Sequence, residues 1–136
     1  MTPKRVLILG GGFAGLSCAR KLAGDRRFEV TLVDRTNHHL FQPLLYQVAT
    51  ASLAAPDIAR SLRQILERAP NVSVLMDEIR TLDPETRTAT GASGRRFVYD
   101  YLVPATGAQT SFFGNDAWEK HALGLKTLEE AQRIRR

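Results

Sequence analysis

Residues 5–15 read RVLILGGGFAG, an apolar run that leads directly into a glycine-rich turn. The apolar residues Val6–Leu9 predict a short buried strand, and the segment after the glycines, Phe13–Ala23, has the pattern of an amphipathic helix. A second predicted strand, Glu29–Val33, ends at Asp34, and this acid follows the last glycine by close to the roughly 20 residues that a dinucleotide-binding βαβ unit shows. The two strands, the glycine-rich turn, the helix and the acid together indicate such a unit.

Each glycine of the motif has its own predicted task. Gly10 allows the tight turn, Gly12 lets backbone N–H groups approach a pyrophosphate, and Gly15 lets the helix pack closely on the strands. The helix N-terminus, with its unpaired N–H groups and partial positive charge, favours phosphate. Asp34 can accept hydrogen bonds from an adenosine ribose and would repel a 2′-phosphate, so the sequence favours FAD or NAD over NADP. The alternative is a structural glycine turn in another βαβ protein.

Length and composition limit the remaining choices. The chain has 136 residues, 43% of them hydrophobic, which is enough for one domain with a core but too short for a complete flavoenzyme with two nucleotide domains. The net charge of +5 comes from scattered arginines without interleaved aromatic residues, which argues against nucleic-acid binding. No apolar run reaches the roughly 20 residues of a membrane-spanning helix, and the N-terminal run is too short for a signal peptide.

Two helical segments are predicted between the second and third strands. The residues after Pro43 form a short helix to about Leu53, and Pro56 opens a longer amphipathic helix that Pro70 ends. The longer segment is expected to be one continuous helix with a single buried face, because its apolar residues recur at helical spacing. These residues are Ile58, Leu62, Ile65, Leu66 and Ala69.

The remaining elements complete an α/β, Rossmann-like parallel sheet. Val72–Met76 is the third parallel strand, and turn residues between short β-prone runs predict a small antiparallel meander near residues 80–98. Tyr99–Val103 is a returning buried strand. The capping box Thr127–Glu130 opens a helix that still runs at Arg136, which leads us to expect a truncated chain.

Five stretches carry a resemblance to a known family: Val6–Gly15 (VLILGGGFAG), Phe41–Ala49 (FQPLLYQVA), Asp57–Leu66 (DIARSLRQIL), Tyr99–Gly107 (YDYLVPATG) and Leu125–Ala131 (LKTLEEA). The chain resembles the N-terminal part of type II NADH dehydrogenases, which are single-subunit, non-proton-pumping NADH:quinone oxidoreductases of respiratory chains. The glycine loop and the turn Ala105-Thr106-Gly107 (the ATG turn) are shared by flavoproteins with two dinucleotide-binding domains. The FQPLLYQVA stretch is the part that points to this family.

This resemblance implies an FAD site. It would place the pyrophosphate on Gly12, Phe13 and Ala14 within the Gly10–Gly15 loop, the ribose on Asp34 and Arg35, the adenine against the backbone of Ile79, and the turn Ala105, Thr106 and Gly107 over the cofactor. In such enzymes NADH passes a hydride to the flavin, which then reduces a quinone, so the protein mainly orients and tunes the cofactor. No catalytic side chain and no metal site is assigned.

The resemblance also implies what residues 1–136 would lack. They would form an incomplete FAD-binding domain, inactive by itself, and the NADH-binding domain and the C-terminal membrane-binding region would lie outside them. The complete protein would be cytoplasmic and peripheral on the membrane, with a homodimer as one possibility. One departure from the family is Pro104, where an aliphatic residue is usual; a proline is tolerated there only at a bulge or at a strand end.

Two other functions stay open at this point. The chain could be a non-catalytic FAD- or NAD-binding module, or part of another FAD-dependent pyridine-nucleotide oxidoreductase. A disulfide reductase needs a redox-active cysteine pair and a sulfide:quinone reductase needs several cysteines, whereas this chain has only Cys18. A lone cysteine in the first helix is best explained by packing, and it fits a reducing compartment.

Several side chains have both a functional and a structural interpretation. The pair His38 and His39 is expected to lie in an exposed polar loop rather than to bind a metal or the flavin. Tyr46 and Gln47 either face the flavin or quinone path, or belong to a short packed helix. The remaining expectations are an exposed helix face for Arg60 and Arg63, and a packed aromatic cluster for Phe112, Phe113 and Trp118.

Overall fold

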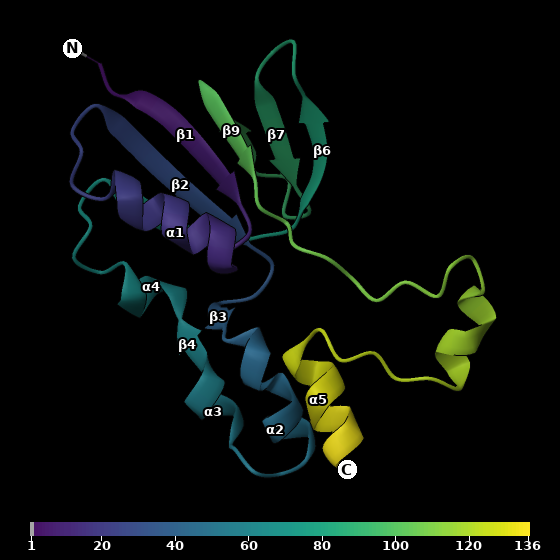
Figure 1. Ribbon diagram of the computed structural model, residues 1–136. Helices are drawn as coiled ribbons and strands as arrows, with labels where there is room; N and C mark the ends of the chain where they lie inside the picture. The colour runs from purple at the N-terminus through teal and green to yellow at the C-terminus, as the bar shows by residue number, and fades with distance from the viewer. Residues whose placement is uncertain (1) are drawn as a thin grey trace. The chain divides into compact units, whose positions relative to one another are not determined.

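The predicted parallel sheet is present in the computed structural model, which describes residues 2–136 (Figure 1). Its four strands, in the spatial order β5-β2-β1-β9, all pair in parallel. The helix α1 (Phe13–Leu22) connects the first two strands. The strands are β1 (Lys4–Leu9), β2 (Phe28–Asp34), β5 (Val72–Met76) and β9 (Tyr101–Pro104). The Rossmann-like α/β fold is thereby confirmed.

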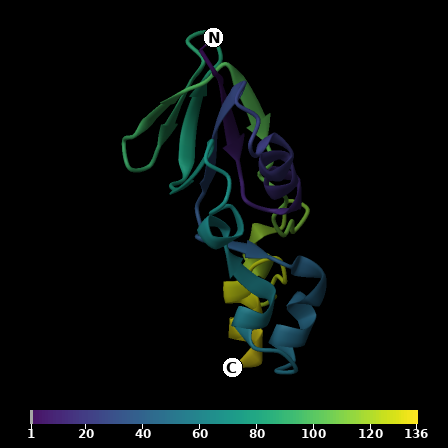
Figure 2. The same ribbon diagram turned by 90° about the vertical axis from the view of Figure 1, so that its left-hand side faces the viewer.

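Both faces of this sheet are covered, as Figure 2 shows from the side. Alternate residues of β1 point to opposite faces, because side chains alternate along a strand. Val6 and Ile8 pack with residues of α1, whereas Leu7 and Leu9 pack with residues of a second, antiparallel sheet. This two-sided burial explains why the strand continues after Arg5 as the unbroken apolar run Val6–Leu9.

The second sheet is the predicted meander. Its strands β6 (Ile79–Asp83), β7 (Thr88–Gly91) and β8 (Arg96–Val98) pair in antiparallel order. The Asp77 carboxylate stabilises the turn before β8, because it accepts hydrogen bonds from the backbone N–H and the hydroxyl of Ser93. These hydrogen bonds, the hydroxyl one first, hold the pKa of Asp77 below its usual value.

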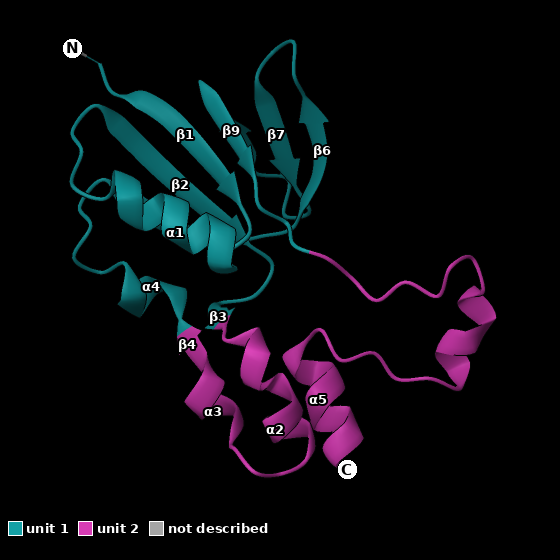
Figure 3. Ribbon diagram, viewed as in Figure 1, with its two compact units in different colours: residues 1–39, 61–107 teal, residues 40–60, 108–136 magenta. Residues whose placement is uncertain are grey.

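The chain divides into two compact units (Figure 3). The first unit contains the two sheets and α1. Its described residues are 2–39 and Ser61–Gly107. The second contains Leu40–Arg60 and Ala108–Arg136. Its core joins Leu45, Val48 and Ala49 to Ile58 and Ala131. Its elements are η1 (Gln42–Leu44), α2 (Leu45–Ala49), α3 (Ala55–Ile58), η2 (Asp116–Lys120) and α5 (Leu128–Arg135).

The capping box of α5 is confirmed. The Thr127 hydroxyl accepts from the Glu130 N–H at 3.2 Å, and the Glu130 carboxylate accepts from the Thr127 N–H at 2.9 Å. The helix that follows buries Ala131 against α2. Both orphan donors of the first turn are therefore satisfied by residues that the sequence already identified.

The prediction of one continuous helix from Pro56 to Ala69 was wrong. This stretch forms α3, an extended segment β4 (Ala59–Ser61) and the single turn α4 (Leu62–Ile65). Ile58 lies in the core of the second unit, whereas Leu62 lies in the core of the first. A continuous helix would turn residues i and i+4 to one face and hence to one core, so the chain extends between them.

The aromatic cluster expected for Phe112, Phe113 and Trp118 is also contradicted. Phe113 is 88% exposed and Trp118 is 55% exposed. The short helix predicted after Pro43 is α2, which ends at Ala49, four residues before the expected limit at Leu53. Pro104, in contrast, is the last residue of β9, which lies at one edge of the four-stranded sheet, and this fits the expected strand end.

Candidate nucleotide-binding site

The predicted site residues of the first unit follow the carboxyl ends of its parallel strands. The strand register aligns these ends, because Leu9 lies opposite both Val33 and Pro104, and Asp34 lies opposite Met76. One end of the sheet, formed by the carboxyl ends of its strands, is therefore followed by the glycine loop, Asp34, Ile79 and the ATG turn. In open α/β sheets, ligands bind at this end.

Gly10 forms the turn that carries the chain out of β1. Its φ of +104° lies in a region that L side chains rarely adopt. A Cβ at this position would also collide with the carbonyl of Ala105, the first residue of the ATG turn. The Ala105 N–H donates to the Leu9 carbonyl at 2.8 Å, so the ATG turn is fixed against the glycine loop.

Gly15 and Gly12 differ in their surroundings. A Cβ on Gly15 would overlap the carbonyl oxygen of Gly10 and would lie 3.2 Å from Ile8 Cγ2. Gly15 therefore permits the close approach of α1 to β1. A Cβ on Gly12 would meet no atom within 4 Å, and no side chain caps α1 at this residue. The space beside Gly12 is open, as a bound pyrophosphate requires.

Asp34 lies directly against the glycine loop. Its Oδ2 accepts from the Gly11 N–H at 2.5 Å, and its Oδ1 accepts from the Thr36 N–H at 2.7 Å and from the Thr36 hydroxyl at 2.8 Å. A carboxylate offers about four acceptor positions, so one remains for a sugar hydroxyl. The arrangement leaves one acceptor position of the Asp34 carboxylate next to the glycine loop.

Gly11 was not assigned a task of its own from the sequence. A Cβ on Gly11 would collide with the side chain of Leu62, which is fully buried and cannot move aside. This contact brings α4 to the loop from far along the chain. No local sequence pattern could have revealed it.

His39 differs from expectation. It belongs to the short strand β3 (His38–Leu40) and is half-buried rather than in an exposed loop. Its Nδ1 lies 2.9 Å from the Gly11 carbonyl oxygen, and its ring makes an edge contact with Phe13, with centroids 5.1 Å apart and planes at 85°. Sequence reasoning missed this contact, because the two hydrogen-bonded residues are 28 positions apart.

The other candidates lie as follows. Ile79 begins β6, shortly after Asp77, whose N–H donates to the Asp34 carbonyl at 2.9 Å. In α2 of the second unit, Leu45 and Val48 are buried and form a packed face, while Tyr46 is 53% exposed, so both interpretations of Tyr46 stay open. Arg60 and Arg63 are both exposed, but they lie in β4 and α4 rather than on one helix. Cys18 packs partly buried against the core of the first unit.

Within residues 2–136, no group of three histidine, cysteine or acidic side chains is arranged to hold a metal ion. No helix of that part of the chain is long and apolar enough to cross a membrane.

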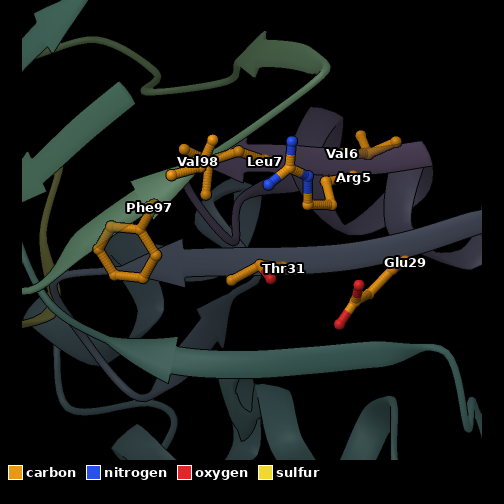
Figure 4. A pocket seen from close by; sticks show the side chains of 7 residues that line it. All are labelled: Arg5, Val6, Leu7, Glu29, Thr31, Phe97 and Val98. Carbon is orange, nitrogen blue, oxygen red and sulfur yellow. The ribbon is translucent and has the colours of Figure 1, made fainter. Parts of the chain in front are cut away.

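A pocket of about 200 Å³ lies elsewhere in the first unit (Figure 4). It is lined by residues of β1, β2 and β8, including Arg5, Glu29 and Phe97. Arg5 and Glu29 stand near the amino ends of their strands, whereas nucleotides bind at the carboxyl ends. None of the predicted cofactor-binding residues lines this pocket, so it is separate from the candidate site.

Comparisons with known proteins agree with this geometry. The family model described as pyridine nucleotide-disulphide oxidoreductase matches residues 4–136. The type II NADH:quinone oxidoreductase NdhA of Mycobacterium tuberculosis is 44% identical over 134 residues, which cover 96% of this chain and 28% of that protein.

Two solved structures have the same fold. The sulfide:quinone oxidoreductase of Aquifex aeolicus superposes with a TM-score of 0.86 at 30% identity, covering 97% of this chain and 30% of that one. NDH2 of Plasmodium falciparum in complex with NADH gives a TM-score of 0.85 at 25% identity, covering 97% and 28%. The chain thus spans less than a third of the length of these proteins. The predicted resemblance to type II NADH dehydrogenases is confirmed.

Proposed function

The chain belongs to the pyridine nucleotide-disulphide oxidoreductase family, and on this premise we propose that it binds FAD on its glycine loop as part of an NADH:quinone oxidoreductase. The observation that carries the proposal is the hydrogen bond from the Gly11 N–H to Asp34 at 2.5 Å. This bond holds the Asp34 carboxylate beside the glycine loop, so the two would be within reach of a single adenosine diphosphate group.

The residues present fit such a cofactor. The open space at Gly12 leaves room for a diphosphate, and the N-cap residue Gly12 has no side chain that could cap α1 in place of a phosphate. The negative charge of Asp34 favours a free ribose over a 2′-phosphate, which supports FAD over NADP.

Each part of the site has a proposed role. The N–H groups of Gly12, Phe13 and Ala14 would hold the diphosphate, with Gly10 and Gly15 keeping the turn tight and α1 close. Asp34 and Arg35 would hold the ribose, the backbone of Ile79 would lie against the adenine, and Ala105, Thr106 and Gly107 would cover the cofactor. When bound, FAD supplies the ability to accept a hydride and pass on electrons. The chain's own residues bind and orient it.

The whole activity is also part of the proposal. NADH would be the hydride donor and a quinone the electron acceptor, without proton pumping, as the similarity to NdhA suggests. Residues 1–136 would form an incomplete FAD-binding domain, and the NADH-binding domain and membrane-binding region would lie outside them. The complete protein would sit on the cytoplasmic face of the membrane, with a homodimer as a further expectation.

A second candidate is another FAD-dependent oxidoreductase of the same family. The likeness to the sulfide:quinone oxidoreductase of Aquifex aeolicus favours it. The higher sequence identity to the NADH:quinone oxidoreductase NdhA, 44% against 30% for the sulfide-quinone reductase of Aquifex aeolicus, favours NADH as the electron donor. NADH therefore remains the preferred donor.

The test is to purify the full-length gene product and record its visible absorption. We expect the absorption bands of oxidised flavin, and their bleaching on anaerobic addition of NADH followed by recovery with a soluble quinone. Bound flavin that sulfide bleaches but NADH does not would select the second candidate, and bound flavin that neither reduces would indicate a binding module. A correctly folded protein that neither contains nor takes up FAD would refute the proposal.

A further inference from the structure

Gly11 is held from three sides within the first unit. Its N–H donates to Asp34 Oδ2 at 2.5 Å, and its carbonyl oxygen lies 2.9 Å from His39 Nδ1. The buried side chain of Leu62 closes the position where a Cβ would stand. Gly11 is itself buried, so its carbonyl oxygen needs a hydrogen-bond partner within the protein, and His39 supplies one.

The Gly11 carbonyl and the Gly12 N–H belong to one peptide unit. That unit is planar and trans, so its carbonyl and its N–H point in opposite directions. Since the carbonyl points to His39, the Gly12 N–H points away from His39. On Gly12 itself no atom lies within 4 Å of the position of a Cβ. The hydrogen bond to His39 thus fixes the direction of a backbone donor in the loop where the diphosphate is proposed to bind.

We propose that His39 is a positioning residue for the diphosphate of FAD, which fixes the Gly11–Gly12 peptide so that the Gly12 N–H faces the phosphate oxygens. This inference rests on the proposed FAD binding. The carbonyl can only accept, so Nδ1 carries the proton. The edge contact with Phe13 keeps the imidazole in place, so His39 touches the residues on both sides of Gly12.

Without the histidine, this peptide is easily reversed. It lies between two glycines, and a glycine backbone can reach conformations that are closed to other residues, including those that a reversed peptide needs. A reversed peptide would present the Gly11 carbonyl to the diphosphate in place of an N–H, and two negatively polarised oxygens would repel each other. His39 therefore acts on cofactor affinity through the loop, without touching the cofactor.

The test compares His39→Leu with His39→Asn in the full-length protein. The two side chains are of similar size and both lack the ring that contacts Phe13, but the asparagine amide nitrogen can donate from near the position of Nδ1. We expect FAD to bind about tenfold more weakly to His39→Leu, the loss of one well-oriented hydrogen bond. The Asn variant should stay within about threefold of the wild type, because it keeps the donor.

The control is His38→Leu, which removes the neighbouring imidazole from the opposite side of β3. It should bind FAD like the wild type. Affinity is measured by titrating apoprotein with FAD, and the melting temperature of each apoprotein is recorded beside it. A merely structural His39 would change the melting temperature and leave the FAD affinity unaltered.

The proposal is overturned if His39→Leu binds FAD as tightly as the wild type, or if His39→Asn is as weak as His39→Leu. If the Leu variant does not fold, His39→Asn is compared with His39→Gln, whose amide nitrogen corresponds to Nε2; the proposal then requires Asn to bind FAD more tightly. A folded wild type without FAD affinity refutes the proposed function itself. It differs from the result that overturns only the role of His39, in which the wild type and the His39 variants all bind FAD tightly.

Discussion

Substituting Gly12 by alanine should weaken cofactor binding strongly while leaving the fold intact. The new methyl group would meet no protein atom within 4 Å, and the φ of −72° suits alanine. The gain of about 0.4–1 kcal/mol from a stiffer unfolded chain nearly cancels the loss of a similar amount at a helix N-cap. We therefore expect the free energy of unfolding of the apoprotein to change by less than about 0.5 kcal/mol.

The effect on binding is expected to be much larger. The methyl group would occupy the space of the diphosphate and displace it from at least one N–H. A hydrogen bond to a charged group contributes about 1.5–3 kcal/mol, which corresponds to roughly a tenfold to hundredfold weaker affinity for FAD. Denaturant unfolding of the apoprotein and titration with FAD measure the two effects separately.

Gly15→Ala is the matched comparison. Its methyl group would overlap the Gly10 carbonyl, a backbone atom that cannot move aside, so the fold should lose about 1–3 kcal/mol or more of stability. Wild-type FAD affinity in the Gly12→Ala protein would refute the assignment of the loop to the diphosphate. Unchanged stability in Gly15→Ala would refute the packing argument.

Three further predictions concern the acid, the pH response and the core. Asp34→Ala should weaken FAD binding at least about tenfold in a titration and cost about 1–3 kcal/mol in denaturant unfolding, because the buried Gly11 N–H loses its acceptor. The hydrogen bond from the Arg27 guanidinium lowers the pKa of Asp25 from 3.8 to about 2. The Asp25 carboxylate therefore stabilises the fold above pH 3.8, and this contribution disappears as the pH falls toward 2. The unfolding curves of the wild type and of Asp25→Asn should converge over that interval, and a constant difference between them would contradict the assignment. Leu62→Ala should destabilise the protein by about 2–5 kcal/mol in the same unfolding assay, because Leu62 is fully buried in the core of the first unit, and a cost below 1 kcal/mol would contradict this placement.

The parts of the fold that the sequence predicted are those specified by neighbouring residues. The strand β1, the glycine turn, α1 and β2 follow from apolar periodicity and from glycines at fixed spacing, all within one βαβ unit. The capping box of α5 is equally local. Parallel strands align their carboxyl ends, so the approach of Asp34 to the loop also followed from the order of elements.

Tertiary structure decided what depends on residues far apart in the chain. The helical spacing of Ile58 and Leu62 suggested a single buried face, yet the two side chains fill the cores of different units, and the backbone extends between them. His39 appeared to be a loop residue, but the fold brings it to Gly11 across 28 positions. Apolar periodicity indicates that a side chain is buried, but it does not specify which residues cover it. Those partners are distant in the sequence, so only the packing of the whole chain determines them.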